Sequence, residues 1–191
     1  MQALSRRVTE VGLTVLQRLF TPRPETLAGR RLYAAAVAQA RSPAFYRDAG
    51  VPDTPEGRFE LYSLHVVLIL HRLKDQGRRA ADISQALFDA YIRSLDDALR
   101  DLGVGDLSVG KKMRKLGEAF YGRVKSYDAA LGPPPDGEAL KALIERTVLA
   151  ETDAAGSSAL VDYVLRAAET RAATPAESLL EADPSWPAFA L

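Results

Sequence analysis

Apolar residues recur at three- and four-residue steps along nearly the whole chain, and this spacing constrains the fold more than any other feature of the sequence. It places the apolar side chains on one face of an α-helix. No segment shows the two-residue alternation that is typical of a half-buried strand. The clearest stripe consists of Val109, Met113, Leu116, Phe120, Val124, Tyr127 and Leu131. We therefore expect an all-α, compact domain of about six to eight helices.

The segment from Leu61 to Leu70 differs from the other helical segments because it is apolar on almost every side. A helix of this kind is usually buried at the centre of a domain. The run is far shorter than the roughly 20 apolar residues that a membrane-spanning helix needs. It is therefore expected to form a central core helix.

Capping signals predict where several helices begin and end. Thr54, followed by Pro55, is typical of a helix start. Asp82 and Gln85 resemble a capping box, and Ser108 is a natural cap for the stripe that follows it. Gly103 is expected to end the preceding helix in the left-handed conformation.

Three sections follow from the pattern along the 191 residues. Residues 1–30 are expected to hold an amphipathic N-terminal helix and a linker. Residues 31–131 are expected to form the core. The proline run after Gly132 separates residues 132–191, a C-terminal helical extension that is expected to pack on the core.

Histidine and cysteine chemistry is scarce in this sequence. It contains no cysteine and two histidines, which excludes disulfides, thiolate metal sites and a cysteine nucleophile. His65 and His71 lie six residues apart and thus on different sides of a helix, so they are not expected to share a metal ion. We expect His65 to be a hydrogen-bonded core residue.

Two stretches resemble enzyme motifs. Residues 105–112, GDLSVGKK, match a phosphate-binding loop except that Lys112 replaces its hydroxyl residue. A helix is predicted before this stretch, where such a loop requires a strand, so we do not expect nucleotide binding. Asp96, Asp97 and Asp101 resemble the aspartates that hold magnesium diphosphate in prenyl-transferring enzymes. No second acidic cluster accompanies them, and a magnesium-dependent prenyl-processing enzyme is the weaker alternative.

Positive charge is concentrated between residues 111 and 125, which contain six basic residues and one acidic residue. Five of these cations are expected to project opposite the apolar stripe, namely Lys111, Lys112, Lys115, Arg123 and Lys125. The formal net charge of the chain is zero, so this is a local feature. The cations could bind anionic lipid headgroups, ribosomal RNA or an acidic protein. An ordinary solvated face, or pairing with the acidic C-terminal part, is an equally good interpretation.

A series of short motifs between Leu32 and Leu131 resembles the ubiquinol–cytochrome c chaperone family. Their order and spacing carry the resemblance more than any single motif does. The motifs are Gln39-Ala-Arg41, Pro43-Ala-Phe-Tyr46, Gly50-Val-Pro-Asp-Thr54, Gly57-Arg-Phe-Glu60, Leu64-His65, Leu87-Phe-Asp89, Leu99-Arg100, Gly103-Val-Gly-Asp106, Val109-Gly-Lys-Lys112, Phe120-Tyr-Gly-Arg123 and Tyr127.

The resemblance implies a non-enzymatic chaperone that binds newly made cytochrome b and promotes assembly of respiratory complex III. It implies no catalytic residue, cofactor or metal, and no DNA binding. The expected partners are cytochrome b, a small partner protein, and the ribosome or an anionic membrane surface. A bacterial member would be cytoplasmic or peripheral to the cytoplasmic face of the inner membrane, and a eukaryotic member would lie in the mitochondrial matrix.

Client binding would require an apolar groove that covers the transmembrane segments of cytochrome b. The candidates are the aromatic residues of the matched region, although a core position is the better interpretation for each of them taken singly. They are Phe45, Tyr46, Phe59, Tyr62, Phe120 and Tyr121. A helical lipid- or isoprenoid-binding protein, with a closed apolar cavity, is the main alternative function.

Overall fold

The computed structural model describes residues 22–150, 152–175, 177–178 and 184–189. Over these residues the chain forms seven helices and no strand, which confirms the predicted all-α class. The helices are α2 (Pro24–Ala40), α3 (Pro43–Arg47), α4 (Pro55–Leu73), α5 (Arg78–Asp101), α6 (Asp106–Ala130), α7 (Gly137–Arg146) and α8 (Ser157–Ala173). The predicted N-terminal amphipathic helix lies outside the described residues. The division at residues 30 and 131 stays a prediction.

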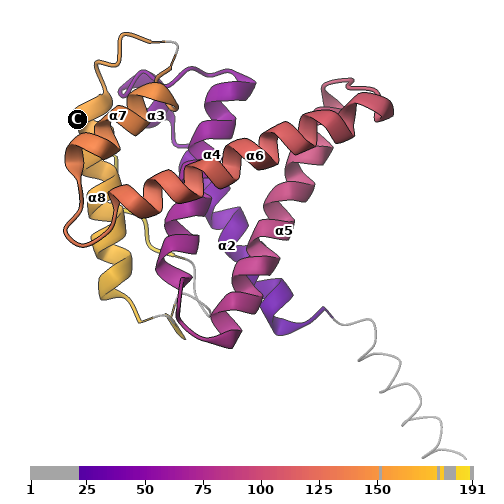
Figure 1. The fold of residues 1–191 in the computed structure, drawn as a ribbon, viewed down its shortest axis with the longest axis horizontal. Coiled ribbons are helices and arrows are strands. Elements are labelled where there is room, and N and C mark those ends of the chain that lie inside the picture. The colour runs from indigo at the N-terminus through magenta and orange to yellow at the C-terminus, as the bar shows by residue number, and fades with distance from the viewer. Residues whose placement is uncertain (1–21, 151, 176, 179–183, 190–191) are drawn as a thin grey trace, which may run out of the picture.

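Helix α4 is the central element of the molecule, as the apolar run predicted. It contacts α2, α5, α6 and α8, and every residue from Ser63 to Ile69 is buried. Figure 1 shows α6 crossing in front of α4, with α2 behind it and α8 on the opposite side from α5. The stripe of α6 faces inward, and α6 packs against α4.

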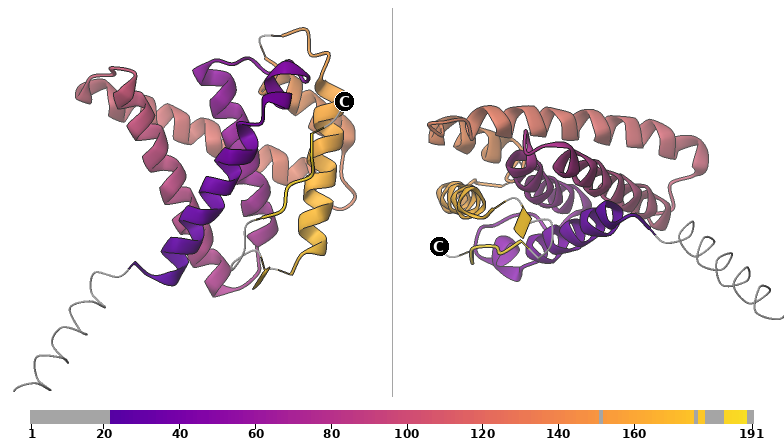
Figure 2. Two further views of the ribbon diagram at one scale, coloured as in Figure 1. Left: turned by 180° about the vertical axis from the view of Figure 1, so that it is seen from behind. Right: turned by 90° about the horizontal axis from the view of Figure 1, so that it is seen from below.

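Helices α2 and α5 run in parallel, because residues four apart in one helix contact residues four apart in the other. A Cβ atom on Gly29 would lie 2.5 Å from the backbone nitrogen of Leu87, and the rings of Tyr33 and Tyr91 are 6.2 Å apart. The close approach at Gly29 requires the absence of a side chain. Figure 2 shows α6 as a layer on one side of these helices.

Two of the predicted helix boundaries are observed. The Thr54 hydroxyl accepts a hydrogen bond of 3.1 Å from the backbone of Gly57 at the start of α4. Gly103 has a φ of 77° just after α5. Its N–H donates to the carbonyl of Arg100, and that of Val104 donates to Leu99, which satisfies the last carbonyls of the helix.

The predicted starts of α5 and α6 were wrong. Each helix begins directly after a glycine that precedes the predicted side-chain cap. Helix α5 begins at Arg78, after Gly77 with a φ of 88°, so Asp82 and Gln85 lie inside the helix. Gln85 donates to Asp89 instead of capping. Helix α6 begins at Asp106, and the negative charge of this carboxylate interacts favourably with the positive end of the helix dipole. Ser108 therefore lies inside the helix and is not its cap.

The C-terminal helices and the last described residues cover the side of α4 that α6 leaves free. Helix α7 is capped by Asp136, which accepts from the backbone of Ala139, and it packs against α6 and α8. Residues 184–189, here named the strap, have no helical structure and lie against α2, α4 and α8. Gln39 donates to the carbonyl of Pro187, and the ring of Phe189 lies 5.0 Å from that of Phe45.

Candidate functional site

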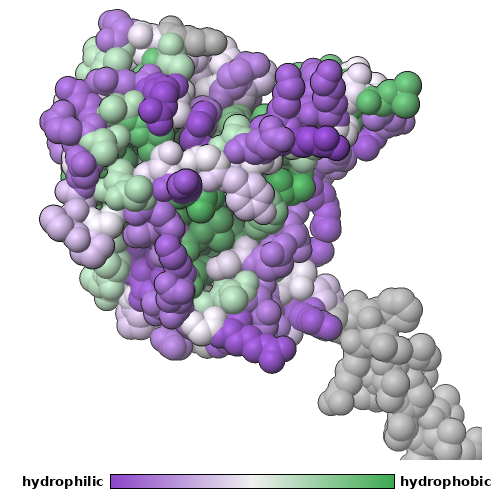
Figure 3. All heavy atoms as spheres, viewed as in Figure 1, coloured by the Kyte–Doolittle hydropathy of each residue, from purple (hydrophilic) through white to green (hydrophobic). Residues whose placement is uncertain are grey.

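A hollow of about 850 Å³ lies between α4, α5 and the underside of α6 and is named here the α6 hollow. Figure 3 shows hydrophobic surface gathered at this place and polar surface around it. Its apolar lining consists of Leu70, Leu73, Phe88, Phe120, Tyr121 and Val124. A contiguous apolar hollow on a protein surface marks a place where another molecule can bind.

The local sequence of α5 explains why the α6 hollow stays open. Ala81 and Ser84 line it, and their small side chains leave the neighbouring ring of Phe88 partly uncovered. The Phe88 ring lies 5.5 Å from Phe120 and 5.7 Å from Tyr121. Phe120 is buried, whereas 63% of Tyr121 is exposed. The site is therefore an aromatic surface on a rigid core.

Charged side chains form the rim of the α6 hollow where α4 ends. Asp128 on α6 accepts hydrogen bonds from His71 Nδ1 at 2.7 Å and from Lys74 Nζ at 2.8 Å. Partial burial alone would raise the pKa of Asp128, but the hydrogen bonds from Lys74 and His71 outweigh burial and lower this pKa. The carboxylate thus stays charged and ties the end of α4 to α6.

The structure brings two of the six predicted aromatic residues together at the α6 hollow, Phe120 and Tyr121. Phe45 is fully buried and packs against His65 and Tyr163, so it is a core residue. Its short helix α3 turns the ring toward α4 and α8.

The remaining three aromatic residues lie near α2 and the start of α4. The Tyr46 hydroxyl donates to the carbonyl of Ala40, and Tyr62 accepts from Arg41. Phe59 is partly buried against the core. None of the three lines the α6 hollow.

Sequence reasoning missed four of the large apolar residues of the α6 hollow, namely Leu70, Leu73, Phe88 and Val124. Phe88 directly follows Leu87, a buried residue of α5, and therefore lies about 100° away around the helix. Two large apolar residues in succession, Leu87 and Phe88, were the available signal that this helix has a second apolar face. Leu70 is part of the predicted core helix and Val124 of the predicted stripe, whereas Leu73 was not singled out.

The cationic face of α6 contains four of the five predicted residues. Lys111, Lys112, Lys115 and Lys125 are exposed. Arg123 is not a free cation, because its Nε and Nη2 atoms donate to both oxygens of Glu60 at 2.9 and 2.7 Å. Only 23% of the Arg123 side chain is exposed, and the bond to Glu60 raises its pKa. Its position nearer the core side of α6 brings it within reach of α4.

Two leucines at the α5–α6 turn form an apolar tip beside these lysines. Leu107 is fully exposed, and 63% of Leu102 is exposed. Figure 1 shows this turn projecting from the rest of the molecule. The tip thus combines uncovered apolar surface with nearby cations.

The near phosphate loop is part of the same turn. Residues 105–112 form the cap and first turns of α6, and the element before them is the helix α5 rather than a strand. The aspartates of the other look-alike motif lie on α5. Asp97 and Asp101 are exposed, and Asp96 accepts from Arg100 at 2.7 Å. Over the described residues, no group of three or more potential ligands could hold a metal ion.

His65 is a core residue, as predicted. It is fully buried, and its Nδ1 atom donates to the carbonyl of Leu61 at 2.7 Å. Its Nε2 atom accepts from the Tyr163 hydroxyl at 2.8 Å. Burial lowers the pKa of His65 to about 3. In the described part of the chain, no helix is long and apolar enough to cross a membrane.

Comparison with known proteins agrees with this architecture. A crystal structure described as that of the Cbp3 homolog from Brucella abortus superposes with a TM-score of 0.80 and is 35% identical, covering 93% of this chain and 97% of the other. The ubiquinol-cytochrome-c reductase complex assembly factor 1 of Xenopus laevis is 25% identical over 81% of this chain and 77% of its own length. The factors of the same name from Mus musculus and Homo sapiens are each 26% identical. The chain spans about half of their lengths, 47% and 54%.

A family model provides the assignment. The model described as ubiquinol-cytochrome C chaperone matches residues 47–186, which include the α6 hollow, the apolar tip and the exposed lysines. The same region carries the ordered short motifs from Gly50 to Tyr127 that suggested this resemblance from the sequence. The chain therefore belongs to the ubiquinol–cytochrome c chaperone family.

Proposed function

We propose that this protein is a non-enzymatic chaperone that binds newly made cytochrome b and promotes assembly of ubiquinol–cytochrome c reductase. The family and the printed names of the relatives support a role in the assembly of this complex. The α6 hollow supports the finer proposal that the protein holds an apolar client. In a bacterial cell this chaperone would act in the cytoplasm or at the cytoplasmic face of the inner membrane, and in a eukaryotic cell in the mitochondrial matrix.

The observation that carries this proposal is the open aromatic surface of the α6 hollow. Transmembrane segments of a client expose apolar side chains that water disfavours, and an apolar helix can lie in a groove of this kind. Tyr121 and Phe88 supply large apolar area with few rotatable bonds. The charged rim of Lys74 and Asp128 leaves the hollow in contact with water when no client is present. Reversible covering of a client segment follows from these two properties.

The open form of the α6 hollow also favours a chaperone over a lipid or isoprenoid carrier. A carrier of that kind is expected to enclose its ligand in an apolar cavity. The α6 hollow is instead bounded by charged residues at its mouth, among them Lys74, Asp75 and Arg78. Co-purification of a lipid with the protein, detected by native mass spectrometry, would support the carrier instead.

We further propose that the tip of the α5–α6 turn places the chaperone at an anionic membrane. Leu107 can enter the headgroup region, while Lys111, Lys112 and Lys115 interact with acidic lipids. Such a position would bring the α6 hollow close to a client that is entering the membrane. Instead of a membrane, the ribosome or a small partner protein could bind these lysines.

Replacement of Tyr121 by aspartate tests the client site. Because 63% of Tyr121 is exposed, Tyr121→Asp should fold normally, while a charge at the centre of the apolar surface disfavours contact with an apolar segment. We expect at least a tenfold loss of newly synthesised cytochrome b that co-purifies with the chaperone, and less assembled complex III on native gels.

The matched control is Leu27→Asp on α2, which changes a residue that is 41% exposed and does not line the α6 hollow. This control should bind the client as the parent does. Normal co-purification of cytochrome b with Tyr121→Asp would show that the α6 hollow does not hold the client.

A further inference from the structure

A polar hollow of about 760 Å³ lies where the end of α2, the helix α3 and the start of α4 meet, and it is named here the arginine hollow. The residues that line it are Arg41, Pro43, Tyr46, Arg47, Asp53 and Arg58. All of them except Arg47 belong to the short motifs that carry the family resemblance, so segments that are separate in the sequence meet at this place. Three arginines thus border one hollow that the proposed client site does not use.

The arginine hollow is open to solvent. The side chains of Arg47 and Arg58 are 73% and 52% exposed, and Arg41 is exposed as well. The volume of the hollow falls in the range of about 300–1,000 Å³ that is typical of sites for small molecules. A ligand therefore has both room and a way in from solvent.

Two of the arginines are each held by one partner and keep donors for another. Arg41 donates through Nε to the Tyr62 hydroxyl at 2.9 Å, and Arg58 donates through Nε to Asp53 at 2.7 Å. Among the described residues, the Nη atoms of both arginines have no partner. A guanidinium group is planar, and two of its N–H groups can donate in parallel to two oxygens of one anion. The bonds at Nε therefore orient both groups without using these donors.

Positive charge exceeds negative charge around the arginine hollow. Among the lining residues only Asp53 is acidic, and Asp48 pairs with Arg47 through both carboxylate oxygens. Arg41 has no carboxylate partner in the described part of the chain. The hydrogen bond at its Nε raises the pKa of Arg41, whereas the nearby charge of Arg58 acts in the opposite direction. Two like charges thus lie close together, and an anion beside them would be stabilised by both.

The donors also indicate which anion fits. A carboxylate has two oxygens in one plane, which a single guanidinium satisfies, whereas a phosphate group has three acceptor oxygens that point in different directions. Arg41 and Arg58 come from different helices and border the same hollow. Burial raises the pKa of Tyr46 to about 12, so its hydroxyl adds no negative charge at neutral pH. A phosphate group, which can accept from two guanidiniums at once, is therefore the better fit.

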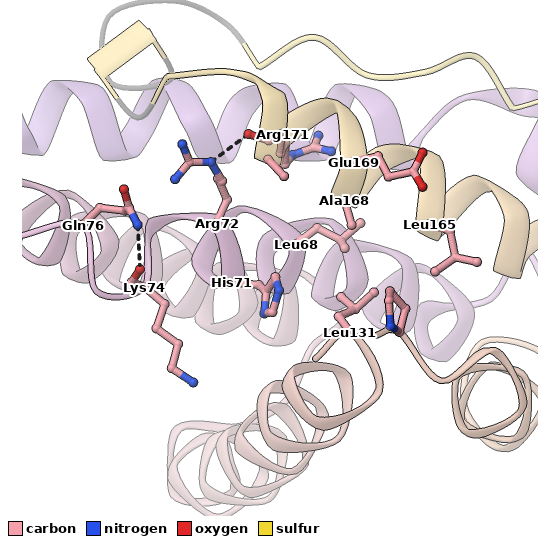
Figure 4. Close-up of a pocket in the computed structure, with 12 residues that line it drawn as sticks. Leu68, His71, Arg72, Lys74, Gln76, Leu131, Leu165, Ala168, Glu169 and Arg171 are labelled. Atoms are coloured by element: carbon pink, nitrogen blue, oxygen red, sulfur yellow. Dashed lines mark hydrogen bonds between the residues drawn. The ribbon is translucent and has the colours of Figure 1, made fainter. Parts of the chain in front are cut away.

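Arginines beside another cavity of the protein are not available in this way. That cavity, of about 500 Å³, lies between α4, α8 and the end of α6. Figure 4 shows Arg72 and Arg171 at its wall, where Arg72 donates through Nε to the carbonyl of Arg171 and through Nη2 to that of Thr174. Arg171 is buried and donates to the carbonyl of Ala167. The bonds of Arg72 join α4 to the end of α8 and thus serve the fold.

We propose that the arginine hollow binds a phosphate group, which accepts hydrogen bonds from the Nη atoms of Arg41 and Arg58 and is attracted by the charge of Arg47. A soluble phosphomonoester and the headgroup of an anionic lipid are the two sources of such a group. The proposal is independent of client binding, because the α6 hollow shares no residue with the arginine hollow.

Titration of inorganic phosphate into the isotope-labelled full chain, followed by nuclear magnetic resonance, tests the site. At constant ionic strength, backbone amide signals of residues 41–58 should shift and reach saturation, whereas those of α8 should not move. Sodium acetate, titrated in the same way, should bind at least tenfold more weakly. Absence of a saturable response to phosphate, or acetate binding as tight as that of phosphate, would overturn the proposal.

The double variant Arg41→Met, Arg58→Met decides whether the response arises at this hollow. Both side chains are exposed, so the variant should fold, and its affinity for phosphate should fall at least tenfold. Arg30→Met, Arg31→Met removes the same charge from exposed residues of α2, and this matched control should bind phosphate as the parent does. Unchanged affinity in the first variant, or an equal loss in the control, would refute the site.

Vesicles that contain phosphatidic acid, whose headgroup is a phosphomonoester, separate the two sources. If Arg41→Met, Arg58→Met lowers co-sedimentation with these vesicles as much as it lowers the affinity for phosphate, the site takes a lipid headgroup. If only the response to phosphate is lost, the site takes a soluble phosphomonoester. Both outcomes support the proposal. The lysines of α6 are unchanged in this variant, so the result is separate from docking of the tip.

Discussion

At the scale of single residues, the pair of Arg123 and Glu60 joins two helices that are far apart in the sequence. Both oxygens of Glu60 on α4 accept hydrogen bonds from Arg123 on α6, and 13% and 23% of the two side chains are exposed. Breaking a bidentate pair that is largely shielded from water lowers the free energy of unfolding much more than breaking a surface pair does. Arg123 is therefore a structural residue rather than part of the cationic face.

Reversal of this charge should destabilise the protein. Arg123→Glu places two carboxylates against each other and should lower the free energy of unfolding by about 3 kcal/mol, as expected when a buried pair is broken. Lys115→Glu, on the exposed face of the same helix, should change it by less than about 0.5 kcal/mol. Urea unfolding followed by circular dichroism measures both. Equal stability of the two variants would contradict the structural role of Arg123.

His65 should make the stability of the protein sensitive to acid. Burial lowers its pKa in the folded state to about 3, below the value of 6.5 expected in the unfolded chain. As the pH falls, the unfolded state binds the proton first, so the contribution of His65 is complete above pH 6.5 and is lost toward pH 3. Between pH 7.5 and pH 5 this loss amounts to about 2 kcal/mol.

The measurement compares the unfolding free energy of the parent with that of His65→Gln at several pH values. The glutamine variant does not titrate in this range, so its stability should fall by about 2 kcal/mol less over the same interval. Its absolute stability does not enter the comparison. Parallel curves for the two proteins would mean that His65 takes up a proton in the folded state.

At the scale of elements, glycines decide how closely the helices approach their neighbours. A Cβ atom on Gly57, in the first turn of α4, would lie 2.0 Å from the carbonyl oxygen of Pro52. Gly122 on α6 has no atom within 4 Å of the corresponding position. The same substitution should therefore have opposite effects at the two positions.

Gly57→Ala should lower the free energy of unfolding by about 3 kcal/mol, because the backbone must move to relieve the overlap. Gly122→Ala should raise it by about 1 kcal/mol, since alanine favours the helix more than glycine does. Thermal unfolding of both variants provides the test. Stabilisation by Gly57→Ala would show that the loop before α4 is free to move away.

The helix boundaries show how far local sequence reasoning reaches. The caps at Thr54 and Gly103 were predictable because a hydroxyl and a glycine each satisfy the backbone groups of the nearest turn. The starts of α5 and α6 were not predicted, because Gly77 and Gly105 precede side chains that could themselves have served as caps. Which of two possible residues starts the helix depends on how the connecting loop fits between the packed helices.

At the scale of the whole molecule, the apolar tip and the lysines of α6 are the surface that the docking proposal places against a membrane. Figure 1 shows the α5–α6 turn projecting from the body, and the α6 hollow lies beneath the same helix. Exposed lysines near an anionic bilayer contribute about 1 kcal/mol each. The docking proposal therefore depends on Lys111, Lys112 and Lys115 and no longer on Arg123.

The double variant Lys112→Glu, Lys115→Glu should bind vesicles that contain anionic phosphatidylglycerol at least tenfold more weakly than the parent, without loss of stability. Binding of the parent should weaken with salt, because screening acts over about 8 Å at physiological ionic strength. Co-sedimentation with these vesicles, and with neutral phosphatidylcholine vesicles, measures the effect. Arg30→Glu, Arg31→Glu, an equal charge change on α2, is the control and should bind as the parent does. Unchanged vesicle binding with loss of ribosome binding would identify the ribosome as the docking partner.

The candidate site was predictable only in part. Phe120 and Tyr121 were chosen because they are adjacent aromatic residues in a matched motif, and both line the α6 hollow. Phe45 had the same appearance in the sequence but is in the core. An aromatic residue is favourable in a core and in an apolar groove for the same reason, the removal of apolar area from water. The sequence alone does not distinguish these two environments.

The sequence by itself determined the helical class, the central position of α4 and the inward face of α6. These features follow from the spacing of apolar residues over a few turns, which is a local property of the chain. Only the tertiary structure decided the α6 hollow, whose walls come from residues 70–88 and 120–128. It also decided the pairing of Arg123 with Glu60 and the burial of Arg171 against Trp186. These contacts join residues that are 15 to 63 positions apart, and their geometry depends on how whole helices pack against one another.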